Sequence, residues 1–162
     1  MLIRCPSQQH TVPAPIAVPP VVLDTNVVLD WLLFGHPDGR TLGAALAAGE
    51  QRWIATTAMR DELAHVLARG ALDHWQPDLP ALWSGWDRHC IEVPPPAATD
   101  PVSRFRCTDP DDQKFIDLAV SNAACLLLSR DRAVLKLARR LREVAVNVVT
   151  PTAWAARLAT PG

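Results

Sequence analysis

The chain has 162 residues, of which 49% are hydrophobic and 20% charged, and its formal net charge is −1 at pH 7. These values are typical of one soluble globular domain, and the near-zero charge excludes a general binder of polyanions. No apolar run reaches the roughly 18 residues that a membrane span needs, and the first residues lack the apolar core of a secretory signal, so we expect a cytoplasmic protein.

The four cysteines are far apart in the chain and form no Cys-x-x-Cys pair; they are Cys5, Cys90, Cys107 and Cys125. This spacing excludes the common zinc-binding patterns, and without a secretory signal a disulfide framework has no support. We therefore expect reduced thiols, with Cys90 and Cys125 inside strands.

Residues 1–19 are polar and rich in proline, with neither a helical nor a strand period, which predicts a flexible leader. We expect the folded domain to span residues 20–162. It begins with the β-branched run at 21–23, which is typical of a strand buried on both faces.

Four further apolar runs predict strands, and apolar residues at helical spacing predict helices between them. The expected strands are 21–23, 53–55, 90–93, 125–128 and 146–149. The expected helices are 26–34, 39–49, 57–67, a short one within 73–88, 111–124, 132–142 and 151–158. Strands that alternate with helices predict an α/β fold, a three-layer α/β/α sandwich around a roughly five-stranded, mainly parallel sheet.

Four acids stand near the carboxyl ends of the predicted strands or in the helices that follow them. They are Asp24, Glu62, Asp112 and Asp131. The carboxyl ends of parallel strands share one edge of the sheet, so these side chains should converge there. Converging carboxylates repel one another unless a cation neutralises them, and their hard oxygens suit Mg²⁺ or Mn²⁺. The acid set therefore predicts metal-dependent hydrolysis.

Other common catalytic patterns are absent from the sequence. It contains no Gly-x-Gly-x-x-Gly loop, no Gly-Lys-Ser/Thr loop and no Gly-x-Ser-x-Gly elbow. Dinucleotide binding, P-loop chemistry and acyl transfer by a serine are therefore disfavoured.

Each acid also has a purely structural interpretation. Asp24 and Asp131 could cap the helices that follow them, and Glu62 could be a solvated acid near a helix start. Asp111 fits a turn and helix cap better than a metal ligand. Asp117 fits a helix-face acid, although it lies near the predicted site.

Several motifs occur in a fixed order along the chain: Val22-Leu23-Asp24-Thr25-Asn26, Glu62-Leu63, Asp109-Pro110-Asp111-Asp112-x-Lys114-Phe115, Leu128-Ser129-Arg130-Asp131 and Val149-Thr150-Pro151. Over residues 20–155 the chain thus resembles the PIN-domain nucleases, in particular the branch of toxins from toxin–antitoxin pairs. Each motif alone is weakly specific, whereas the ordered set is strongly so.

The resemblance implies a ribonuclease that depends on Mg²⁺ or Mn²⁺, with Asp24, Glu62, Asp112 and Asp131 as its catalytic acids and metal ligands. Asn26 and Ser129 match polar residues that support them. The resemblance also implies an RNA substrate, an antitoxin protein as partner and a homodimer. The chain departs from the family pattern only in its long leader and in Ser129, where threonine is commoner.

Arginine makes up almost all of the 16 basic residues and is frequent in the last third of the chain. Arg130 and Arg132 flank the last acid and are candidates for contacting substrate phosphate, because arginine matches phosphate oxygens bidentately. Two alternatives stay open: a PIN-fold binding or regulatory module that acts through a protein partner, and a related nuclease directed at DNA.

Overall fold

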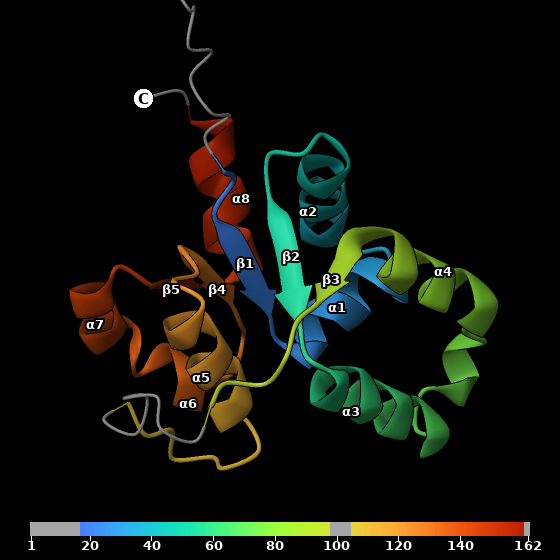
Figure 1. Cartoon of the computed structure of the whole chain (residues 1–162). Helices are drawn as coiled ribbons and strands as arrows, with labels where there is room; N and C mark the ends of the chain where they lie inside the picture. Colours follow the sequence, from blue (N-terminus) through green and yellow to red (C-terminus); the bar gives the residue numbers. More distant parts are fainter. Residues whose placement is uncertain (1–16, 98–104, 161–162) are drawn as a thin grey trace, which may run out of the picture.

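The structure is a computed structural model that describes residues 17–97 and 105–160 (Figure 1). Most of the predicted leader and Cys5 lie outside these residues, and the proposed division at residue 20 remains a prediction. Within the described ranges no helix is both long and apolar enough to cross a membrane.

Five strands form one sheet in which every neighbouring pair is parallel, in the order β3-β2-β1-β4-β5. The strands are β1 (Pro20–Leu23), β2 (Arg52–Ala55), β3 (Cys90–Glu92), β4 (Leu126–Leu128) and β5 (Asn147–Val149). All residues of the central β1 and of β4 are buried, as expected of strands covered on both faces.

The helices connect the strands in alternation. They are α1 (Thr25–Leu32), α2 (Pro37–Ala47), α3 (Thr57–Ala68), η1 (Asp73–Trp75), α4 (Leu79–His89), α5 (Gln113–Ser121), α6 (Arg132–Leu135), α7 (Ala138–Leu141), η3 (Arg142–Val144) and α8 (Pro151–Ala159). In Figure 1, α5 lies in front of the sheet, where it contacts β1 and β4, and α8 passes behind β1. Helices α1 and α8 both contact α2. The predicted three-layer α/β/α sandwich is confirmed.

Two predicted helices differ most from the observed ones. The helix expected from residue 111 begins at Gln113, because Asp109 first closes a turn: its side-chain Oδ1 accepts from the Asp111 amide at 2.9 Å. The helix expected over 132–142 is divided into α6, α7 and η3, and it ends at Ala145 in the left-handed conformation, with φ of 61°.

The strand order places the candidate site. The chain leaves β1 to build β2 and β3 on one side, and later returns to place β4 and β5 on the other. This reversal is a topological switch point, where the loops after β1 and β4 diverge and leave a crevice at the carboxyl edge of the sheet. Asp24 follows β1 directly, and Ser129 follows β4 directly.

The buried sheet should dominate stability. Leu127, in β4, is completely buried, so Leu127→Ala should lower the free energy of unfolding by about 2–5 kcal/mol through lost transfer energy and a cavity. The matched control is Leu158→Ala in α8, whose side chain is 53% exposed. Urea denaturation of both variants gives the comparison. Equal losses would contradict the placement of Leu127 in the core.

Candidate active site

Asp24 is the most buried of the four acids, with 3% of its surface exposed. Its backbone amide donates to the carbonyl of Leu128 at 3.0 Å, which continues the β1–β4 ladder by one residue. Its Oδ2 accepts from the hydroxyl of Ser129 at 2.6 Å, and its Oδ1 accepts from the backbone amide of Asn26 at 3.4 Å. Burial raises the pKa of Asp24, and these hydrogen bonds oppose the rise only in part.

Ser129 links two of the predicted acids. While its hydroxyl donates to Asp24, its Oγ accepts from the backbone amide of Asp131 at 3.0 Å. The Oδ1 of Asp131 in turn accepts from the amide of Ala133 at 2.7 Å and caps α6. Asp131 is thus a helix cap, as its structural interpretation predicted. Its other carboxylate oxygen has no hydrogen bond within the described residues, so the cap leaves a site role open.

Asp112 lies at the N-cap position of α5 but makes no capping hydrogen bond with its side chain. Its Oδ2 is buried and has no hydrogen-bond partner among the described residues. Burial is the largest cause that raises the pKa of Asp112 to about 7, followed by repulsion from Asp24 and Asp131 and then from Asp109 and Glu62. An orphaned buried carboxylate oxygen is costly, and a cation would satisfy it.

Glu62 lies in the second turn of α3 and is already paired. Its Oε2 accepts a short hydrogen bond from the hydroxyl of Thr25, and its Oε1 lies 2.8 Å from the Nζ of Lys114. Thr25 and Lys114 are the residues that sequence reasoning missed. Lys114 lies two residues after Asp112 within the motif at 109–115, and Thr25 directly follows Asp24, yet only the fold brings both to Glu62.

The four acids interact electrostatically with one another. Glu62 and Asp131 each raise the pKa of Asp24, and all three raise that of Asp112. Among the described residues, however, no three His, Cys, Asp or Glu side chains already form a metal-holding cluster. The donor set and the orphaned oxygen of Asp112 fit a hard divalent cation, and side-chain movement would be needed to complete the cluster.

The supporting residues act differently from one another. Ser129 contributes its side chain to Asp24, whereas Asn26 contributes its backbone amide and its residue is exposed. Arg130 donates to the Oδ1 of Asp30 at 2.9 Å, and burial raises the pKa of Asp30. This ion pair gives Arg130 a structural role. Arg132 is exposed.

The remaining sequence features are structural. Trp86 is 2% exposed and packs edge-on against Trp53 with ring centroids 4.7 Å apart, so it belongs to the core. Cys90, Cys107 and Cys125 are free thiols. Cys90 begins β3 as predicted, whereas Cys125 directly precedes β4.

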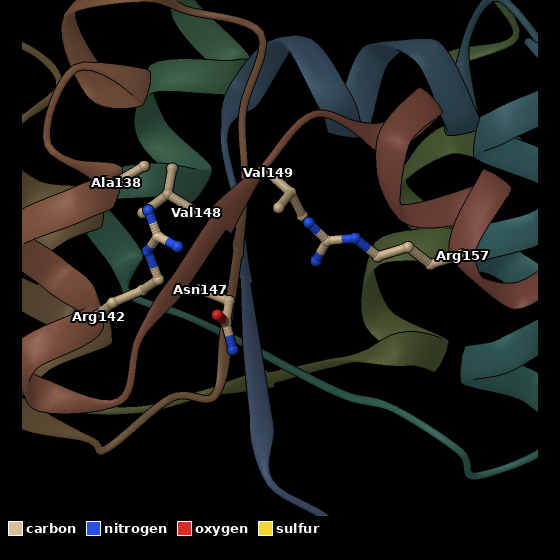
Figure 2. Close-up of a pocket in the computed structure, with 6 residues that line it drawn as sticks. All are labelled: Ala138, Arg142, Asn147, Val148, Val149 and Arg157. Carbon is tan, nitrogen blue, oxygen red and sulfur yellow. The ribbon is translucent and has the colours of Figure 1, made fainter. Parts of the chain in front are cut away.

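A separate pocket of about 170 Å³ lies along the outer strand β5 and contains none of the four acids (Figure 2). Arg142 and Arg157 reach it from opposite sides of the strand in this view. The pocket holds two cationic side chains and no carboxylate, so it does not favour a divalent cation, and the candidate chemistry belongs to the acids.

Comparison with known proteins identifies the family. The family model described as "PIN domain" matches residues 20–133. The chain belongs to the PIN-domain family. The matched range includes all four acids, and PIN domains are generally nucleases that use divalent metal ions.

Among solved structures, this PIN domain is similar to the crystal structure of VapBC2 from Rickettsia felis bound to a DNA fragment from their promoter. The TM-score is 0.53 at 14% sequence identity, over 81% of this chain and 98% of that chain. At this identity the similarity supports the fold alone. The search of curated proteins found no match.

The electrostatics of Asp112 predict a stability effect. Because its pKa is raised in the folded protein, the ionised form costs stability as the pH rises from about 4 to about 7. Asp112→Asn should therefore stabilise the metal-free protein at pH 8 by about 1 kcal/mol, after allowance for solvent screening, and this gain should disappear near pH 4. Thermal denaturation in EDTA at both pH values measures it.

Asp61→Asn is the matched control, since Asp61 is an exposed acid of α3. It should leave the stability nearly unchanged at pH 8. An Asp112→Asn variant that is less stable than the wild type at pH 8 would contradict the assigned electrostatics.

Proposed function

We propose that this PIN domain is a metal-dependent endoribonuclease that hydrolyses RNA phosphodiester bonds and acts as the toxin of a toxin–antitoxin pair. The observation that carries this proposal is the buried, unpaired Oδ2 of Asp112 among three further acids at the carboxyl edge of the sheet. Such an arrangement costs stability unless a cation occupies it. A protein that only bound partners through this fold would have no use for that cost.

Asp24, Asp112, Asp131 and Glu62 would hold Mg²⁺ or Mn²⁺, directly or through water. The ion, when bound, would lower the pKa of a bound water and stabilise charge on the phosphate. Ser129 holds Asp24 in place through a 2.6 Å hydrogen bond, and the cap to Ala133 fixes Asp131. Lys114 neutralises Glu62 in the structure, and it would be free to turn toward a phosphate once a metal takes over this role.

The proposed partners follow from the family and from the structural neighbour. The neighbour is described as a VapBC2 complex bound to promoter DNA, and this supports an antitoxin as the protein partner here. RNA as substrate and a homodimeric state are further parts of the proposal, and both rest on the resemblance to PIN-domain toxins.

Replacement of Asp24 tests the proposed chemistry. Asp24→Asn keeps the shape of the side chain but removes one anionic ligand, so metal-dependent cleavage should fall about 100-fold or more. Cleavage of a mixed panel of single-stranded RNAs with Mn²⁺, Mg²⁺ or EDTA measures this. Asp61→Asn is the matched control and should cleave like the wild type.

Metal binding gives an independent readout. Mg²⁺ or Mn²⁺ should raise the melting temperature of the wild type, and this shift should shrink in Asp24→Asn and in Asp112→Asn. A wild type that neither cleaves RNA nor binds either metal by calorimetry would overturn the enzyme proposal and favour a binding module. Cleavage of DNA in preference to RNA would identify a DNA-directed nuclease.

The arginines beside the last acid give a second prediction. If Arg130 or Arg132 contacts a substrate phosphate, its replacement by alanine should weaken RNA binding. The slope of the logarithm of affinity against the logarithm of salt concentration should also become shallower by about one. Fluorescence anisotropy over a range of salt concentrations measures both quantities. Unchanged affinity and slope would exclude that arginine. Asp30→Asn separates the two roles of Arg130, because it breaks the ion pair and leaves the guanidinium in place.

A further inference from the structure

A pocket of about 390 Å³ opens beside the acid cluster. Its walls are the start of α3 at Thr56 and Ala58, residues 95–97 after β3, and one face of α5 at Lys114 and Asp117. Lys114 joins this pocket to the acids, because the same side chain pairs with Glu62. The volume is in the range of small-molecule sites, and the lining combines apolar residues with a few polar groups.

The start of α3 provides unused hydrogen-bond donors. Thr56 occupies the N-cap position, but its side chain makes no capping hydrogen bond. The residue is only 4% exposed, and within the described ranges its hydroxyl has no partner, although it lines the pocket. The backbone amides of Thr57 and Ala58, at the first helical positions, are likewise without acceptors there. A helix N-terminus with free amides attracts a phosphate.

Helix α5 adds one cation and one acceptor. Lys114 and Asp117 are three residues apart and therefore share a face of the helix. Lys114 donates to Glu62 and to the carbonyl of Asp111, which leaves one of its three donors. Asp117 accepts from the Nε2 of Gln113 through Oδ1 at 2.8 Å, and its Oδ2 has no hydrogen bond within the described residues. A carboxylate in this position would repel a phosphate but accept a hydrogen bond from a hydroxyl.

We propose that this pocket is a ribonucleotide subsite: the start of α3 and Lys114 hold a backbone phosphate, residues 95–97 cover the sugar and base, and Asp117 accepts a hydrogen bond from the ribose 2′-hydroxyl. This proposal rests on the proposed nuclease function and assigns its preference for RNA. The 2′-hydroxyl distinguishes RNA from DNA, and a fixed carboxylate is a suitable acceptor for it. Gln113 fixes Asp117, since it also contacts the backbone of Phe105 and Cys107.

The test measures binding of matched single-stranded RNA and DNA oligonucleotides by anisotropy, with EDTA present so that no cleavage occurs. The wild type should bind RNA about 10- to 100-fold more tightly than DNA, which is the effect of one hydrogen bond to a charged group. Asp117→Ala and Asp117→Asn should lose most of this ratio through weaker RNA binding. Removing a negative charge would by itself strengthen binding to both polymers, so a loss specific to RNA identifies the hydrogen bond.

Three further variants complete the experiment. Glu143→Gln removes an exposed negative charge in η3 and should leave the RNA-to-DNA ratio unchanged. Ala58→Trp should fill the pocket and weaken the binding of RNA and of DNA alike, since it blocks the phosphate site. Thr56→Val should weaken the binding of both polymers equally, because it removes the hydroxyl donor at the phosphate site. Melting temperatures confirm that each variant is folded.

An unchanged RNA-to-DNA ratio in both Asp117 variants would overturn the subsite, and so would unimpaired binding by Ala58→Trp. Cleavage assays of the same proteins with Mn²⁺ keep the two proposals apart. Wild-type cleavage that depends on Asp24, together with an unchanged ratio in the Asp117 variants, would support the nuclease proposal and contradict only the subsite. Absence of both cleavage and metal binding in the wild type would contradict the nuclease proposal itself.

Discussion

The candidate site depends on the direct pairing of β1 with β4. This pairing brings Asp24 and Ser129, which are 105 residues apart in sequence, within 2.6 Å of each other at the carboxyl edge of the sheet. The sheet buries the Asp24 carboxylate, and the loops and helices that leave the same edge bring three more acids near it. Charge repulsion at this point is a consequence of the topology, because parallel strands release their following residues on one side.

The four acids differ in how far hydrogen bonds and ion pairs compensate their charge. Asp24 and Asp131 gain hydrogen bonds from Ser129 and from a helix amide, and Glu62 gains an ion pair with Lys114. Asp112 gains none for its buried Oδ2, and its pKa is raised to about 7. The protein thus leaves one carboxylate oxygen uncompensated where a divalent cation would compensate it, and it neutralises a second acid with Lys114.

The pocket beside the acids extends the same principle to the proposed ribonucleotide. The uncapped start of α3 and the face of α5 that carries Lys114 and Asp117 both line this pocket, so donors and an acceptor meet next to Glu62, one of the four candidate acids. A helix N-terminus without its cap loses local stability, typically about 1 kcal/mol, which a bound phosphate would restore.

The sequence by itself determined the alternation of strands and helices, and with it the parallel sandwich and the placement of Asp24 and Asp131 after buried strands, because apolar runs and their punctuation are local signals. It also indicated the PIN family through the order of its motifs. Only the tertiary structure decided that Asn26 contributes its backbone, that Arg130 pairs with Asp30, and that Thr25 and Lys114 contact Glu62. These contacts join residues from different strands and helices, and their geometry follows from how the layers pack, which no local pattern encodes.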